Sequence, residues 1–114
     1  MQKISGIVIR GKQKGRELGF PSANLKLEKV DKLKSGVYAG ETFFDGEKFQ
    51  SAIFLDIENK ILEAHVLDFS GDLYGKKIEV VLGEKIRDIL KFESEKDLIE
   101  QVQKDLFQIR NTKL

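Results

Sequence analysis

The dipeptide Asp45-Gly46 is the feature that most constrains how this chain of 114 residues can fold. An Asp-Gly pair between two apolar segments is a strong signal for a two-residue hairpin turn, because both of its residues tolerate a positive φ. The flanking segments 36–44 and 48–56 contain Val, Ile, Phe, Tyr and Thr, which favour strands. The sequence therefore predicts an antiparallel hairpin at this point.

Short strands separated by turns continue through most of the chain. Segment 61–69 alternates, so that Glu63 and His65 share one face with Leu67 and Phe69. Segment 86–92 is ambiguous between strand and helix. The remaining strands are expected at 4–10, 25–27 and 77–83.

One helix is predicted near the C-terminus. Ser94 has the hydroxyl of a helix N-cap, and Asp97 follows three positions later. An apolar stripe at three- and four-residue spacing comes next, formed by Ile99, Val102, Leu106 and Ile109. A run of strands followed by one helix predicts a mainly β fold, a small antiparallel β-barrel with a C-terminal α-helix packed on it. Residues 1–114 are expected to form a single domain.

The charge balance argues against a polyanionic partner. Twenty Lys and Arg stand against 19 Asp and Glu, a net charge of +1, whereas nucleic-acid binders usually carry a clear basic excess. No apolar run is long enough to span a membrane, and residues 1–6 lack the apolar segment of a signal peptide. We therefore expect a cytoplasmic monomer that binds neither nucleic acid nor membrane. One histidine and no cysteine exclude thiolate and multi-histidine metal sites.

The segment 19–25 is the first candidate site. It contains the only proline, and Ser22 and Asn24 would share one face if the segment is extended. Two neutral oxygens beside the basic, glycine-containing segment 11–19 suit a hydrated Mg²⁺ that carries a polyphosphate. That segment could form a flap over phosphates, although it has no Walker sequence. The alternative is a surface turn in which the hydroxyl and the amide satisfy backbone groups.

Glu63 is the second candidate, since it interrupts an otherwise apolar strand. A carboxylate on a covered face needs a partner or a task, and it could be a general base for a ligand hydroxyl. Alternatively, this face is solvated and Glu63 pairs with His65. The loop 68–75 could clamp a planar ring, or Phe69 and Tyr74 could close the end of the barrel.

Four blocks of the sequence resemble one enzyme family, the riboflavin kinases, which include the flavokinase domain of bacterial bifunctional FAD synthetases. Residues 15–25 resemble the family signature with its Gly-Phe-Pro-Thr-Ala-Asn core, and residues 36–39 match its Gly-Val-Tyr-Ala strand. Residues 63–69 with 72–75 resemble its Glu-x-His-x-x-Asp-Phe and Asp-Leu-Tyr-Gly block. The C-terminal block is matched by Ile86, Arg87, Lys91, Phe92, Ser94, Leu98, Gln101 and Asp105.

The resemblance implies a six-stranded antiparallel Greek-key β-barrel and transfer of the γ-phosphate of ATP to the 5′-hydroxyl of riboflavin, giving FMN and ADP. Ser22 and Asn24 would hold Mg²⁺, and Glu63 and Asn24 would be catalytic. Riboflavin would lie near Glu63, Arg87, Phe92 and Asp105. The nucleotide would be contacted by Gly11, Lys14, Gly15, Arg16, Ser22, Asn24, His65, Leu67, Phe69 and Tyr74.

Two departures from the family pattern keep other functions open. Position 22 is Ser where the family has Thr, so the methyl that restricts the rotamer is lost and weaker metal binding is expected. Segment 49–60 stands in place of the family's Asn-x-Gly-x-x-Pro-Thr-Phe and is shorter. The chain could thus be an impaired flavin- or nucleotide-binding module, or a β-barrel interaction domain. It could also be part of a longer bifunctional protein.

Overall fold

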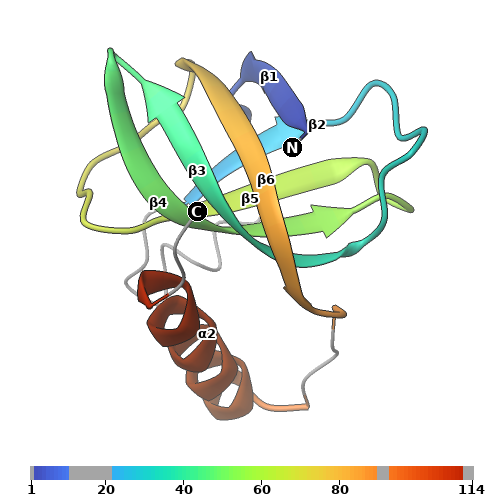
Figure 1. Cartoon of the computed structure of the whole chain (residues 1–114), viewed down its shortest axis with the longest axis vertical. Helices are drawn as coiled ribbons and strands as arrows, with labels where there is room; N and C mark the ends of the chain where they lie inside the picture. The colour runs from blue at the N-terminus through green and yellow to red at the C-terminus, as the bar shows by residue number, and fades with distance from the viewer. Residues whose placement is uncertain (1, 11–21, 90–92, 112–114) are drawn as a thin grey trace.

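The described part of the chain forms a nearly closed antiparallel barrel with a C-terminal helix beside it (Figure 1). The computed structural model describes residues 2–10, 22–89 and 93–111. Its elements are β1 (Lys3–Ile7), β2 (Ser22–Lys26), β3 (Gly36–Phe44), β4 (Glu47–Asp56), β5 (Ile61–Val66), β6 (Lys77–Arg87) and α2 (Glu95–Arg110). The predicted mainly β class, with six antiparallel strands and a C-terminal helix, is confirmed.

The strand order β1-β6-β3-β4-β5-β2 contains a Greek key. Strands β3, β4 and β5 follow one another as hairpins, and β6 returns to pair with β3, which is the defining connection of that motif. The outer strands approach one another where Ile9 bridges Asn24, with the Ile9 N–H donating to the Asn24 carbonyl at 2.8 Å. This bridge brings the two edges of the sheet together.

The Asp45-Gly46 turn joins β3 and β4 as the sequence predicts. Both residues have positive φ, 52° and 76°, which matches the right-handed twist of the strands they connect. Phe44 pairs with Glu47 across the turn. The predicted bounds of β3 are confirmed, and β4 begins one residue earlier than expected.

Several other strand boundaries were wrong. β2 begins at Ser22 instead of residue 25, because residues 22–26 pair along their whole length with β5. β5 ends at Val66 and not at residue 69, since Asp68 adopts a positive φ of 57°. β6 continues to Arg87, which settles the ambiguous segment as strand as far as that residue, whereas residues 90–92 lie outside those described.

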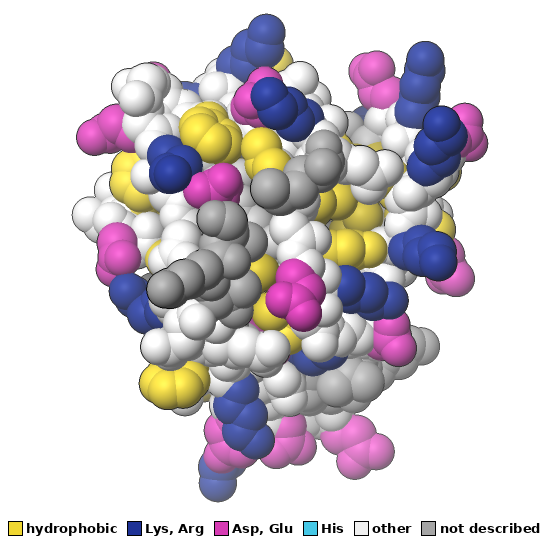
Figure 2. Space-filling model, viewed as in Figure 1, with side chains coloured by type: hydrophobic (Ala, Val, Ile, Leu, Met, Phe, Trp, Pro, Cys, Tyr) yellow, Lys and Arg dark blue, Asp and Glu magenta, His cyan; other side chains and the backbone are white. Residues whose placement is uncertain are grey.

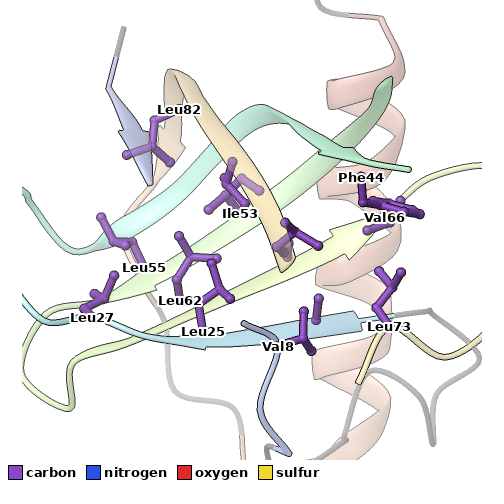
Figure 3. Close-up of a cluster of buried hydrophobic side chains, with 14 residues drawn as sticks. Val8, Leu25, Leu27, Phe44, Ile53, Leu55, Leu62, Val66, Leu73 and Leu82 are labelled. Carbon is purple, nitrogen blue, oxygen red and sulfur yellow. The ribbon is translucent and has the colours of Figure 1, made fainter. Parts of the chain in front are cut away.

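The barrel interior is filled by apolar side chains from all six strands and the adjoining loops (Figure 3). Leu25 on β2, Ile53 and Leu55 on β4, and Leu62 on β5 are at most 1% exposed. Because side chains alternate along a strand, the residues between them point out of the barrel. The polar residues of β2 and β5 therefore lie on the outer face.

Helix α2 covers part of that outer face. Its N-cap is confirmed, since the Ser94 hydroxyl accepts a hydrogen bond from the Asp97 N–H at 3.2 Å. Ile109 is buried against Ala39 and Ala52 of the barrel's outer side. Among the described residues, no helix is both long and apolar enough to span a membrane.

Gly40 lies where the sheet leaves no room for a Cβ, and its replacement by Ala should destabilise the protein. A Cβ at position 40 would lie 2.7 Å from both Ile53 Cγ1 and the Val81 carbonyl oxygen. Overpacking of this kind costs about 1–3 kcal/mol, measurable by urea unfolding. Gly6→Ala is the matched control, because its Cβ would meet Leu25 at an ordinary 3.5 Å. Equal effects of the two substitutions would contradict the close packing at Gly40.

Candidate active site

A single row of side chains crosses five strands on the outer face of the barrel. Strand register pairs Asn24 with Glu63, Glu63 with Phe54, Phe54 with Val37, and Val37 with Arg87. Neighbouring strands are about 4.8 Å apart, so the row runs roughly 19 Å along the curved sheet. A polar end at Asn24 and Glu63 is thereby joined, through two apolar residues, to a guanidinium.

A second row lies beside the first. Ser22 pairs with His65, and His65 pairs with Ala52 on the next strand. At the β2–β5 end, the two rows place Ser22, Asn24, Glu63 and His65 together as a polar quartet. The sequence predicted that each pair shares a face, and the structure brings the two pairs, some 40 residues apart, side by side.

Glu63 and His65 form the closest polar contact of the quartet. His65 Nε2 lies 2.8 Å from Glu63 Oε1, and the two side chains are 5% and 24% exposed. The Phe54 ring packs edge-on against the imidazole, with ring centroids 4.8 Å apart. Among the described residues, Glu63 Oε2 makes no hydrogen bond.

Ser22 and Asn24 supply two further oxygens. Asn24 is 7% exposed, yet its side-chain amide makes no hydrogen bond within the described part of the chain. Ser22 is half-buried, and its hydroxyl also makes no hydrogen bond within the described part of the chain. Mg²⁺ commonly takes few protein oxygens and completes its shell with phosphates and water. The two side chains fit that requirement, although residues 2–10, 22–89 and 93–111 contain no group of three or more metal-ligating His, Cys, Asp or Glu.

At the opposite end of the row, Arg87 fastens helix α2 to the barrel. Its Nε and Nη2 donate to the two carboxylate oxygens of Asp105, at 2.9 and 2.7 Å, and Nη1 donates to the Asp88 carbonyl. Gln101 adds a third hydrogen bond to Asp105, which is only 1% exposed. The two residues expected to border riboflavin thus bind each other. Their contact with a ligand remains a prediction.

Apart from Ser22, Asn24 and His65 in the quartet, the described residues expected near the nucleotide are dispersed. Leu67 is buried between the barrel and Ile109 of α2, while Phe69 packs edge-on against Phe44 and Phe49. Tyr74 is half-exposed and lies under the Arg10 guanidinium at 4.2 Å. The packing of Phe69 thus agrees with the alternative in which this side chain helps to close the end of the barrel. Gly11, Lys14, Gly15, Arg16 and Phe92 lie outside the described residues.

Sequence reasoning missed the place of Phe54. Phe54 was not among the predicted site residues, yet it points outward beside Glu63 and is partly exposed. The alternation along the strand was the signal that could have found it, because its neighbours on both sides face the core.

Comparisons with known proteins identify first the fold and then the family. A crystal structure of a macrolide-efflux protein from Streptococcus pneumoniae superposes with a TM-score of 0.85 at 28% identity, over 97% of this chain and 39% of that one. Riboflavin kinase from Trypanosoma brucei superposes with a TM-score of 0.66 over 96% and 77% of the two chains; at 24% identity this likeness shows the fold alone.

The family follows from the sequence as a whole. The flavokinase model, described as riboflavin kinase, matches residues 1–113, so the chain belongs to the riboflavin kinase family. A bifunctional riboflavin kinase/FMN adenylyltransferase from Buchnera aphidicola subsp. Schizaphis graminum is 40% identical over 112 residues, which is 90% of this chain and 36% of the relative. The chain therefore spans only about a third of the length of such relatives.

Breaking the buried ion pair should loosen the helix from the barrel. Asp105→Ala leaves Arg87, whose side chain is 14% exposed, without its partner, and removing one member of a buried pair costs about 3–5 kcal/mol. Asp68→Asn is the matched control, because it weakens the exposed Asp68–Arg110 pair that ties the loop after β5 to the same helix. Thermal unfolding should show a large loss of Tm for the first variant and little for the second. The reverse order would contradict the role of the Arg87–Asp105 pair in holding α2 to the barrel.

Proposed function

We propose that this chain is a riboflavin kinase domain, which transfers the γ-phosphate of ATP to the 5′-hydroxyl of riboflavin to give FMN and ADP. The polar quartet is the observation that carries the proposal, because it gathers on one face a carboxylate and two side-chain oxygens that make no hydrogen bond within residues 2–10, 22–89 and 93–111. Membership of the family supports the same reaction.

The quartet has the groups that phosphoryl transfer requires. Glu63 Oε2 would accept the proton of the riboflavin hydroxyl while that oxygen bonds to the γ-phosphorus and the bond to ADP breaks. Ser22 and Asn24 would hold Mg²⁺ and the phosphates, and the metal would offset their negative charge. Such reactions depend mostly on alignment and charge stabilisation, and alignment alone can supply roughly 7–11 kcal/mol.

Riboflavin would extend from Glu63 along the outer row. Phe54 presents a partly exposed aromatic ring next to Glu63. Val37, which is fully buried, lies between Phe54 and Arg87 in the row. The flavin ring system is planar and largely apolar, so an aromatic side chain at this position suits it. Arg87, Asp105 and Phe92 would then border the far end of the substrate.

A second candidate is a module that binds flavin or nucleotide without catalysis. It is favoured by the segment after β4, which turns directly into β5 through a tight turn where Asp56 accepts hydrogen bonds from Asn59. The family's longer segment would add ligand contacts at this point. Ser22, without the methyl of threonine, would further weaken the grip on the metal.

The kinase reaction is tested by incubating the protein with riboflavin and MgATP and separating FMN chromatographically. Glu63→Gln should lower turnover by about 10²–10⁴-fold, since a well-placed general base contributes that much. Asn24→Ala should be at least as damaging, because alignment of the phosphates is lost. Glu79→Gln, at an exposed acid of β6, is the control and should keep full turnover. Full turnover in Glu63→Gln would show that Glu63 is not the general base.

The binding module predicts a different outcome in the same samples. Riboflavin fluorescence would be quenched by the wild-type protein, yet no FMN would form with Mg²⁺, Mn²⁺ or Zn²⁺. The kinase instead predicts FMN whenever MgATP is present and none after chelation of the metal. Turnover by the wild-type protein would exclude the binding module.

A further inference from the structure

His65 is a buried polar side chain that the proposed reaction leaves without a task. It is the only histidine of the chain. Its Nε2 lies 2.8 Å from Glu63 Oε1, whereas its buried Nδ1 finds no hydrogen-bond partner among the described residues. The two nitrogens of this ring therefore have unequal environments.

The different environments of Nε2 and Nδ1 indicate which nitrogen of the imidazole carries the proton. An ionised carboxylate can only accept a hydrogen bond, so Nε2 must carry a proton to donate to Glu63. A second proton on Nδ1 would bury an N–H group without an acceptor, which folded proteins avoid. The geometry thus favours the neutral tautomer with its proton on Nε2.

The ring is also held in one orientation by its neighbours. Phe54 packs edge-on against it at 4.8 Å, and its strand partners are Ser22 on β2 and Ala52 on β4. An imidazole that is 5% exposed and packed in this way has little freedom to rotate. It therefore presents Nε2 to Glu63 in a fixed direction.

We propose that His65 is a positioning residue for Glu63. In its Nε2-protonated, neutral form it holds Oε1 and so directs Oε2 toward the ligand hydroxyl. The inference rests on the proposed role of Glu63 as base, but gives His65 a role other than the nucleotide contact that family resemblance implies. His65 itself transfers no proton.

The tautomer can be measured without any enzymatic reaction. Protein labelled with ¹⁵N-histidine contains one imidazole, so a long-range ¹H–¹⁵N correlation spectrum at neutral pH reports it without overlap. We expect a protonated Nε2 and an unprotonated Nδ1. A proton on Nδ1, an imidazolium, or averaging between tautomers would overturn the proposal. In Glu63→Leu, which removes the acceptor, the preference for protonated Nε2 should relax.

A double-mutant cycle then tests the positioning itself. His65→Leu removes the donor and should lower kcat by about 10- to 100-fold, the range expected for a hydrogen bond to a charged group, with little change in KM for riboflavin. His65→Gln keeps an N–H donor and should recover part of the loss. In the Glu63→Gln background, His65→Leu should cause no further decrease, because its effect passes through the carboxylate.

The results separate this inference from the function on which it rests. Equal losses from His65→Leu with and without Glu63→Gln, or a selective rise in KM for ATP, would overturn positioning while leaving the kinase intact. Wild-type protein without turnover would overturn the proposed function, and the NMR spectrum would still decide the tautomer. Thermal unfolding of each variant identifies losses caused by misfolding, and if His65→Leu does not fold, His65→Gln and the NMR measurement decide the proposal.

Discussion

The antiparallel register between β2 and β5 is the constraint on which the rest of the candidate site depends. It pairs Ala23 with Ala64 and Leu25 with Leu62 inside the barrel, and by the same alternation it places Asn24 beside Glu63 outside. A slip of one residue would exchange the two faces, burying the polar side chains and exposing the core. The stability of the core and the geometry of the quartet are therefore fixed by one set of backbone hydrogen bonds.

Helix α2 covers part of this outer face, which would be fully exposed to solvent in an open sheet. The Arg87–Asp105 pair ties the helix to β6, and Ile109 packs against Ala39 on β3 and Ala52 on β4, so residues there are partly covered. Elsewhere, Figure 2 shows basic and acidic side chains interspersed over the visible face. A net charge of +1 provides little long-range attraction for a polyphosphate. Local groups near the quartet would have to supply the affinity.

The departures from the family pattern affect the surroundings of the quartet more than the quartet itself. Ser22 retains the hydroxyl oxygen, and its register with His65 is regular. The shortened segment is accommodated as continuous strand up to Asp56, which leaves Phe54 as the aromatic side chain nearest to Glu63 along the row. The row thus retains an apolar surface next to the carboxylate, although the residue that provides it was not recognisable as a site residue from the family signature.

Local chemistry in the sequence determined the hairpin at Asp45-Gly46, the Ser94 cap, the mainly β class and the family, because each depends on residues close together in the chain or on a contiguous motif. Tertiary structure decided the start of β2, because its first residues have weak strand propensity and become strand by pairing with β5. Alternation along β4 puts Phe54 on the face opposite to Ile53 and Leu55, but only the tertiary structure decided that Phe54 lies beside Glu63 and that Arg87 binds Asp105. These two contacts join distant segments, so their physical cause is register and packing, which no local pattern specifies.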